Sequence, residues 1–86
     1  MKTFPLIISS PDGDLFREPA VKISLRGCEG DLAVMAGHIP FVTSVKECDC
    51  TVELENGEVK TGHTAGGILN VAEKSVTLLS GSFVWK

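Results

Sequence analysis

The stretch Glu29–Lys46, E-G-D-L-A-V-M-A-G-H-I-P-F-V-T-S-V-K, contains two short apolar runs, Leu32–Met35 and Phe41–Val45. The corner Gly37–Pro40 separates the two runs, and its proline restricts the backbone there. The acidic loop Glu29–Asp31 leads into the first run. Both runs are the right length for buried strands, and both loops can present side chains to a partner. We expect the rest of the chain to be organised around this unit.

Alternation of apolar and polar residues continues outside this stretch, and no segment shows the period of an amphipathic helix. Residues 21–26 are the clearest case, because Val21, Ile23 and Leu25 share one face and polar residues occupy the other. Glycines and prolines separate the short apolar segments. This pattern predicts an all-β fold of about ten short strands, an antiparallel sandwich or a small barrel, with essentially no helix.

Two prolines make specific predictions about strand ends. Pro5 lies near the start of an alternating segment, and a proline cannot donate a hydrogen bond to a ladder. We therefore expect the first strand to lie at an edge of a sheet or to begin at Pro5. After a turn at Pro11–Gly13, we expect a short strand at Leu15–Glu18 that Pro19 ends.

The dipeptide Asn56–Gly57 lies between two alternating segments and predicts a β-hairpin with a two-residue type I′ turn. Such a turn would place Glu53 opposite Lys60 as an exposed ion pair between neighbouring strands. The same register, extended by further pairs, would place His63 opposite Cys50.

The predicted hairpin raises the question of a metal site, because Cys48 would share a strand face with Cys50 and His63. Zinc sites usually use a C-x2-C knuckle and four good ligands, and C-x-C on a strand is not that pattern. The alternative interpretation is that these are small buried side chains, as cysteines often are. With Cys28 the chain has three cysteines, which cannot all pair with one another, so we expect reduced thiols.

Catalytic motifs are not visible in the sequence. It has no G-x-S-x-G elbow, no grouping typical of a catalytic triad, and no glycine loop suited to phosphate, because the loop around Gly30 is acidic. We therefore predict a protein that is not an enzyme, with no catalytic residues, no cofactor and no metal ligands.

Length and charge limit the possible functions. The 86 residues fit a single domain spanning 1–86. The net charge of -3 and the scattered positions of the eight basic residues argue against nucleic acid as a partner. No apolar stretch is long enough for a signal peptide or a membrane span, so we expect a cytoplasmic protein without direct membrane insertion.

Four segments resemble the N-terminal domain of the epsilon subunit of F-type ATP synthases. Glu29–Leu32 is similar to the G-E-G-[DE]-L loop of that family, and Gly37–Pro40 is similar to its P-G-H-x-P corner. Ser10–Gly13 matches the early S/T-P-D-G turn, and Ala65–Val71 matches the S-G-G-F/I-L-E-V strand. The order and distances of these segments agree with the family over nearly the whole chain.

The resemblance implies a β-sandwich that serves as a non-catalytic subunit of the central stalk and couples rotation of the c-ring to the gamma subunit and the catalytic head. It implies that the protein lies in the cytoplasm, peripheral on the inner face of the cell membrane, as part of a proton- or sodium-driven ATP synthase. By the same resemblance, Glu29, Gly30 and Asp31 would contact the c-ring. The corner residues Gly37, His38, Ile39 and Pro40 would contact the gamma subunit.

Two departures from the family pattern keep a second interpretation open. Ala36 stands where the family more often has proline, and the family usually continues into a two-helix C-terminal domain that this sequence lacks. If 86 residues is the natural length, we expect neither ATP binding nor inhibitory helices. The alternative is a free-standing β-sandwich adaptor or a small metal-binding protein. We expect the terminal apolar cluster Phe83–Trp85 to fold back onto the sandwich.

Overall fold

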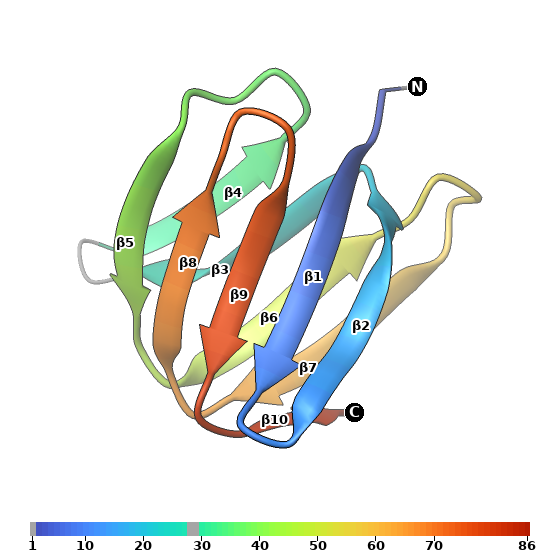
Figure 1. Cartoon of the computed structure of the whole chain (residues 1–86). Coiled ribbons are helices and arrows are strands. Elements are labelled where there is room, and N and C mark those ends of the chain that lie inside the picture. Colours follow the sequence, from blue (N-terminus) through green and yellow to red (C-terminus); the bar gives the residue numbers. More distant parts are fainter. Residues whose placement is uncertain (1, 28–29) are drawn as a thin grey trace.

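The computed structural model describes residues 2–27 and 30–86, and these form ten strands and no helix. The strands lie in two layers that face each other across a core (Figure 1). This arrangement confirms the predicted β-sandwich. One layer contains, in spatial order, β5 (Phe41–Val45), β8 (Gly67–Val71), β9 (Val76–Ser80), β1 (Phe4–Ser10) and β2 (Gly13–Ala20). The other contains β4 (Gly30–Met35), β3 (Lys22–Gly27), β6 (Cys48–Glu53), β7 (Val59–Thr64) and β10 (Phe83–Trp85).

The two layers are joined by hydrogen bonding at one corner, where Gly27 of β3 pairs with Val45 of β5. Neighbouring strands are antiparallel except for β1 and β9, which run parallel from the pair Leu6–Val76 to the pair Ser9–Leu79. In the described part of the chain, no helix is long and apolar enough to cross a membrane.

The proline predictions were partly wrong. Strand β1 lies between β2 and β9 rather than at an edge, but its ladder with β9 starts only at Leu6, so Pro5 is not required to donate there. Strand β2 continues through Pro19 to Ala20 instead of ending at Glu18. Pro19 is tolerated because β2 is an edge strand, bonded only to β1, and its partner residue there is Pro5.

The hairpin between β6 and β7 exists, but its register differs by one residue from the prediction. A type I′ turn needs a positive φ at Asn56, and among the described residues only glycines have one. Instead, Gly57 at φ 89° donates to the Leu54 carbonyl, and Leu54 pairs with Glu58 around a three-residue loop. The longer loop moves every later pair by one position.

The shifted register changes the partners of the charged residues. Glu53 pairs with Val59, and its carboxylate lies 4.0 Å from Lys22 on β3 rather than beside Lys60. Lys60 pairs with Val52, and its ammonium lies 5.0 Å from the centroid of the Trp85 ring. The predicted ion pair between Glu53 and Lys60 is therefore wrong.

The core lies between the two layers and is made of the inward-facing residues of nine strands. The C-terminal cluster contributes to it as expected, because β10 pairs with β7 and buries Phe83. The Trp85 ring lies 4.8 Å from that of Phe83 and 5.6 Å from that of Phe16 on β2, so it closes one side of the sandwich. The buried apolar residues are Phe4, Leu6, Ile8, Phe16, Ala20, Ile23, Leu25, Val34, Val45, Cys50, Val52, Leu69, Val71, Val76, Leu78 and Phe83.

Candidate partner-binding site

The corner between β4 and β5 is anchored by His38. Its Nδ1 atom lies 2.7 Å from the Met35 carbonyl oxygen, and its Nε2 atom lies 2.8 Å from the carbonyl oxygen of Ala72. The imidazole also meets the Phe4 ring edge to face, with 5.8 Å between the centroids. His38 thus connects the corner to the turn between β8 and β9, which lies beside it at the same end of the sandwich (Figure 1).

The other corner residues point outward. Gly37 adopts φ 89°, which allows the chain to reverse direction after β4. Ile39 is 81% exposed, and Pro40 is also exposed. Of the four residues predicted to contact a partner, His38 therefore holds the corner in place, while Ile39 and Pro40 present apolar surface.

An uncharged face adjoins this corner. We use this name for the outward-facing residues of β5, β8, β9 and β1, which are Val42, Ser44, Ile68, Asn70, Thr77, Leu79, Ile7 and Ser9. Cross-strand pairing sets them in two rows, and none carries a charge. Val42 is 66% exposed, and Ile68 and Leu79 are directly opposite each other and exposed. An uncharged area that exposes several large apolar side chains is typical of a surface that a partner covers.

The outer face of the opposite layer is charged. Lys22 faces Glu53, Arg26 faces Asp31, and Asp49 contacts both His63 and Lys86. On the first layer, charged side chains lie at the edge strand β2, where Arg17 and Asp14 form an ion pair. The area over β5, β8, β9 and β1 is therefore the better candidate for a large protein contact.

The acidic loop is only partly described, since Glu29 lies outside the described residues. Gly30 adopts φ 124° at the start of β4, and Asp31 is exposed. The Nε atom of Arg26 donates to Asp31 at 2.8 Å, and this hydrogen bond and ion pair raise the pKa of Arg26. Asp31 thus presents a carboxylate to solvent while one of its oxygens is held by the neighbouring strand.

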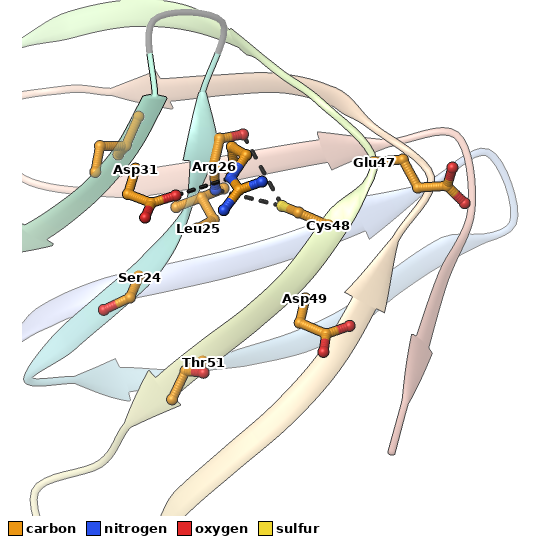
Figure 2. Close-up of a pocket in the computed structure, with 9 residues that line it drawn as sticks. Ser24, Leu25, Arg26, Asp31, Glu47, Cys48, Asp49 and Thr51 are labelled. Atoms are coloured by element: carbon orange, nitrogen blue, oxygen red, sulfur yellow. Dashed lines mark hydrogen bonds and ion pairs between the residues drawn. The ribbon is translucent and has the colours of Figure 1, made fainter.

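A cleft of about 470 Å³ lies beside this ion pair (Figure 2). It opens because β3 pairs with β6 only from Lys22 to Ser24, and the two strands then diverge. Cys48 points from β6 toward Arg26, whose backbone N–H donates to the sulfur at 3.3 Å. The cleft is lined by Ser24, Leu25, Arg26, Asp31, Leu32, Glu47, Cys48, Asp49 and Thr51.

The metal interpretation of Cys48, Cys50 and His63 is wrong, because the three side chains do not converge. In the observed register His63 pairs with Asp49 and lies on the outer face, whereas Cys50 is fully buried on the inner face. Burial, with a smaller effect from Cys48, raises the pKa of Cys50 to about 12, so its thiol stays protonated. Within residues 2–27 and 30–86, no three His, Cys, Asp or Glu side chains are grouped to hold a metal ion.

Comparison with known proteins agrees with this architecture. The family model of the ATP synthase delta/epsilon chain, beta-sandwich domain, matches residues 3–86. ATP synthase epsilon chains of Bacillus thuringiensis (strain Al Hakam) and Bacillus mycoides (strain KBAB4) are each 37% identical to the chain over 87 residues. The alignment covers 95% of this chain and 61% of each relative, so the chain spans about three fifths of the length of these curated relatives.

Solved structures show the same fold. A chain in the structure of the Euglena gracilis mitochondrial ATP synthase, OSCP/F1/c-ring, superposes with a TM-score of 0.91 at 26% identity, over 96% of this chain and 53% of that one. A chain of the Tetrahymena thermophila mitochondrial ATP synthase central stalk/c-ring superposes with a TM-score of 0.77 over 95% and 66% of the two chains. Its 11% identity supports the fold alone. The family match and the curated relatives establish that this chain belongs to the beta-sandwich family of ATP synthase delta/epsilon chains.

Proposed function

We propose that this chain is a non-catalytic component of the central stalk of an F-type ATP synthase, where it couples rotation of the membrane c-ring to the gamma subunit. The relatives named epsilon chain and the structural neighbours in ATP synthase assemblies support this role. The observation that carries it is that two dissimilar candidate contact sites lie at opposite ends of one strand, β4. In such a complex the protein is peripheral to the membrane, on its cytoplasmic side.

The gamma subunit is the proposed partner of the corner and the uncharged face. Burying this face costs little desolvation, because it contains no charged side chain. Ile39 projects from the corner beside Pro40, and Val42 continues the apolar surface onto β5. Exposed apolar side chains on a rigid support are suitable anchors for a protein interface. His38 contributes by holding the corner in place.

The c-ring is the proposed partner of the acidic loop. Asp31 keeps acceptor positions free of Arg26, and the loop that contains Glu29 and Gly30 precedes it directly. We propose that polar or basic groups of the ring bind there. An exposed contact of this kind controls orientation and association rate more than affinity.

Strand β4 connects the two sites mechanically. It begins at Gly30 in the acidic loop and ends at Met35 beside the corner, and six consecutive residue pairs join it to β3. At a rise of ~3.4 Å per residue, its ends are roughly 17 Å apart. A force applied to one end reaches the other through a hydrogen-bonded strand backed by a packed core, which deforms little.

Co-purification with the gamma subunit tests the proposal. The chain should elute with gamma of the same organism as one stable species. Val42→Lys should abolish that complex, because it places a charge on the uncharged face. Val59→Lys is the matched control, since Val59 is 55% exposed on the outer face of the other layer, and it should leave the complex intact. If well-folded gamma forms no complex, or both variants behave alike, the proposed gamma contact is wrong.

Binding to a purified c-ring tests the second site. Asp31→Asn should slow association, and the difference from the unmodified chain should shrink as salt is added, because screening weakens exposed charge contacts. Glu55→Gln removes an exposed carboxylate from the β6–β7 loop and serves as the control. An equal effect of both substitutions would indicate a general charge effect and would refute a specific contact at Asp31.

A further inference from the structure

His63 is held between two carboxylates on the charged face. Its Nδ1 atom lies 2.9 Å from an oxygen of Asp49, and its Nε2 atom lies 3.2 Å from an oxygen of Glu47. A neutral imidazole carries one N–H, whereas an imidazolium carries two, and an ionised carboxylate can only accept. Both contacts can therefore be hydrogen bonds only when His63 is protonated.

The charges around His63 favour this protonated form. The residues that face it are Asp49, which is its pair on β6, Glu47, which precedes β6, and Val84, which is its pair on β10. Lys86 lies beyond Asp49 and donates to its second oxygen at 2.7 Å. The carboxylates of Glu47 and Asp49 and the ammonium of Lys86 together carry a charge of -1 before the imidazole is counted.

The directions of the pKa shifts of His63 and Asp49 agree with this geometry. The hydrogen bond to Asp49, followed by that to Glu47, raises the pKa of His63 above its ordinary value, although desolvation works weakly in the opposite direction. The hydrogen bond from Lys86, followed by that from His63, lowers the pKa of Asp49. Each partner thus stabilises the charged form of the other.

We propose that His63, Glu47 and Asp49 form a proton-controlled latch, which fixes the segment entering β6 against β7 while His63 is protonated and loosens when the proton leaves. In the neutral state one imidazole nitrogen presents a lone pair to a carboxylate, so one of the two contacts must break. The latch acts on Glu47 and Asp49, which line the cleft beside Arg26 and Asp31. Deprotonation of His63 also makes the net charge beside this cleft more negative by one.

The direction of the pH dependence follows from linkage. Because the pKa of His63 is raised in the folded chain, the latch contributes its full stability below the ordinary value of 6.5. This contribution is lost as the pH rises through the folded value. The segment at Glu47 should therefore become more mobile toward alkaline pH, and no partner is needed for this change.

NMR titration of the isolated chain tests the latch without any partner, so its result is independent of the stalk proposal. The two histidine C–H signals are assigned with His63→Gln. The midpoint of His63 should lie above 6.5, should fall in Glu47→Gln and in Asp49→Asn, and should be unchanged in the control Glu55→Gln. The backbone amide of Glu47 should shift with the same midpoint. A His63 midpoint at or below 6.5, or one insensitive to both substitutions, would overturn the proposal.

Equilibrium unfolding supplies a second, independent readout. His63→Gln should fold, because the side chain is 41% exposed and lies outside the core. The unmodified chain should exceed His63→Gln in unfolding free energy at pH values below the folded pKa of His63, and the difference should decline above it. A difference that stays constant with pH would show a packing role instead, and the latch would be rejected.

Discussion

The Nε2 atom of His38 lies 2.8 Å from the carbonyl oxygen of Ala72, although the two residues are 34 positions apart in sequence. This contact links the corner before β5 to the turn between β8 and β9. The ring is packed against Phe4 on its other side, so its orientation is set by three separate segments. In the proposed gamma contact, His38 would therefore act by positioning Ile39.

Replacing His38 by alanine should lower the unfolding free energy by ~1–2 kcal/mol, because a hydrogen bond from the imidazole to a backbone carbonyl and the ring contact with Phe4 are lost. Affinity for gamma should fall as well, since Ile39 would no longer be held in place. Ile39→Ala should weaken gamma binding while changing stability by less than ~0.5 kcal/mol, as expected for an exposed side chain. Urea unfolding and binding assays on both variants separate positioning from contact. Equal stability losses would contradict this assignment.

At Gly67, the backbone of β9 lies too close to β8 to leave room for a side chain. A Cβ atom at this position would clash with the carbonyl oxygen of Leu79, which cannot move without disrupting the strand pair. We expect Gly67→Ala to destabilise the chain by about 3 kcal/mol or more, measured by thermal or urea unfolding.

Gly81→Ala is the matched control for that substitution. A Cβ atom there would meet no atom within 4 Å, and the backbone is not in the left-handed region. Its effect on unfolding free energy should stay within ~0.5 kcal/mol. Similar losses in the two variants would mean that the backbones at Gly67 can separate easily.

The C-terminal strand is expected to be essential for stability. Phe83 is buried and lies against Gly62 of β7 and the Trp85 ring. Phe83→Ala should lower the unfolding free energy by about 3 kcal/mol, because truncating a buried aromatic ring leaves a cavity. Val84→Ala, on the exposed side of the same strand, should have a small effect on the same urea curve. A small effect of both would show that β10 is dispensable.

The unfolding free energy at acidic pH should depend on Asp49. Its pKa is lowered in the folded chain, by Lys86 first and His63 second, so its contribution is complete above the unfolded value of 3.8 and is lost as the pH falls through the folded value. Asp49→Asn should therefore be less stable than the unmodified chain at mildly acidic pH and equal to it at strongly acidic pH. Unfolding free energies measured across the acid range, well below the titration of His63, would show this convergence. Parallel curves would contradict it.

The strands were largely predictable, because each depends on the alternation of apolar and polar residues within one short segment. Alternation in 21–26 places Ile23 and Leu25 inside, and the structure buries both. The exact register of the β6–β7 hairpin was not predictable from Asn56–Gly57 alone, because the same dipeptide fits a two-residue or a three-residue loop. The backbone angle of Asn56 decides between them. In the structure the Gly57 N–H donates to the Leu54 carbonyl, and the Glu58 N–H donates to the side-chain oxygen of Asn56.

The candidate site was predictable only in part. The corner and the acidic loop could be located from their motifs, but the internal role of His38 depends on Ala72, which tertiary folding brings close. The uncharged face was missed because Val42, Ile68 and Leu79 come from separate strands that the sequence does not align. The signal that could have found it is the absence of charge at the outward positions of these segments.

The position of β1 between β2 and β9 has a consequence for the order of folding. The parallel ladder joins Leu6–Ser9 to Val76–Leu79, so the first strand gains its second neighbour only after almost the whole chain is available. Contacts between such distant segments slow folding. During synthesis, the edge of β1 that later pairs with β9 therefore stays unpaired until β9 has left the ribosome. Folding of this layer is therefore expected to be a late step, completed after translation of the β9 segment.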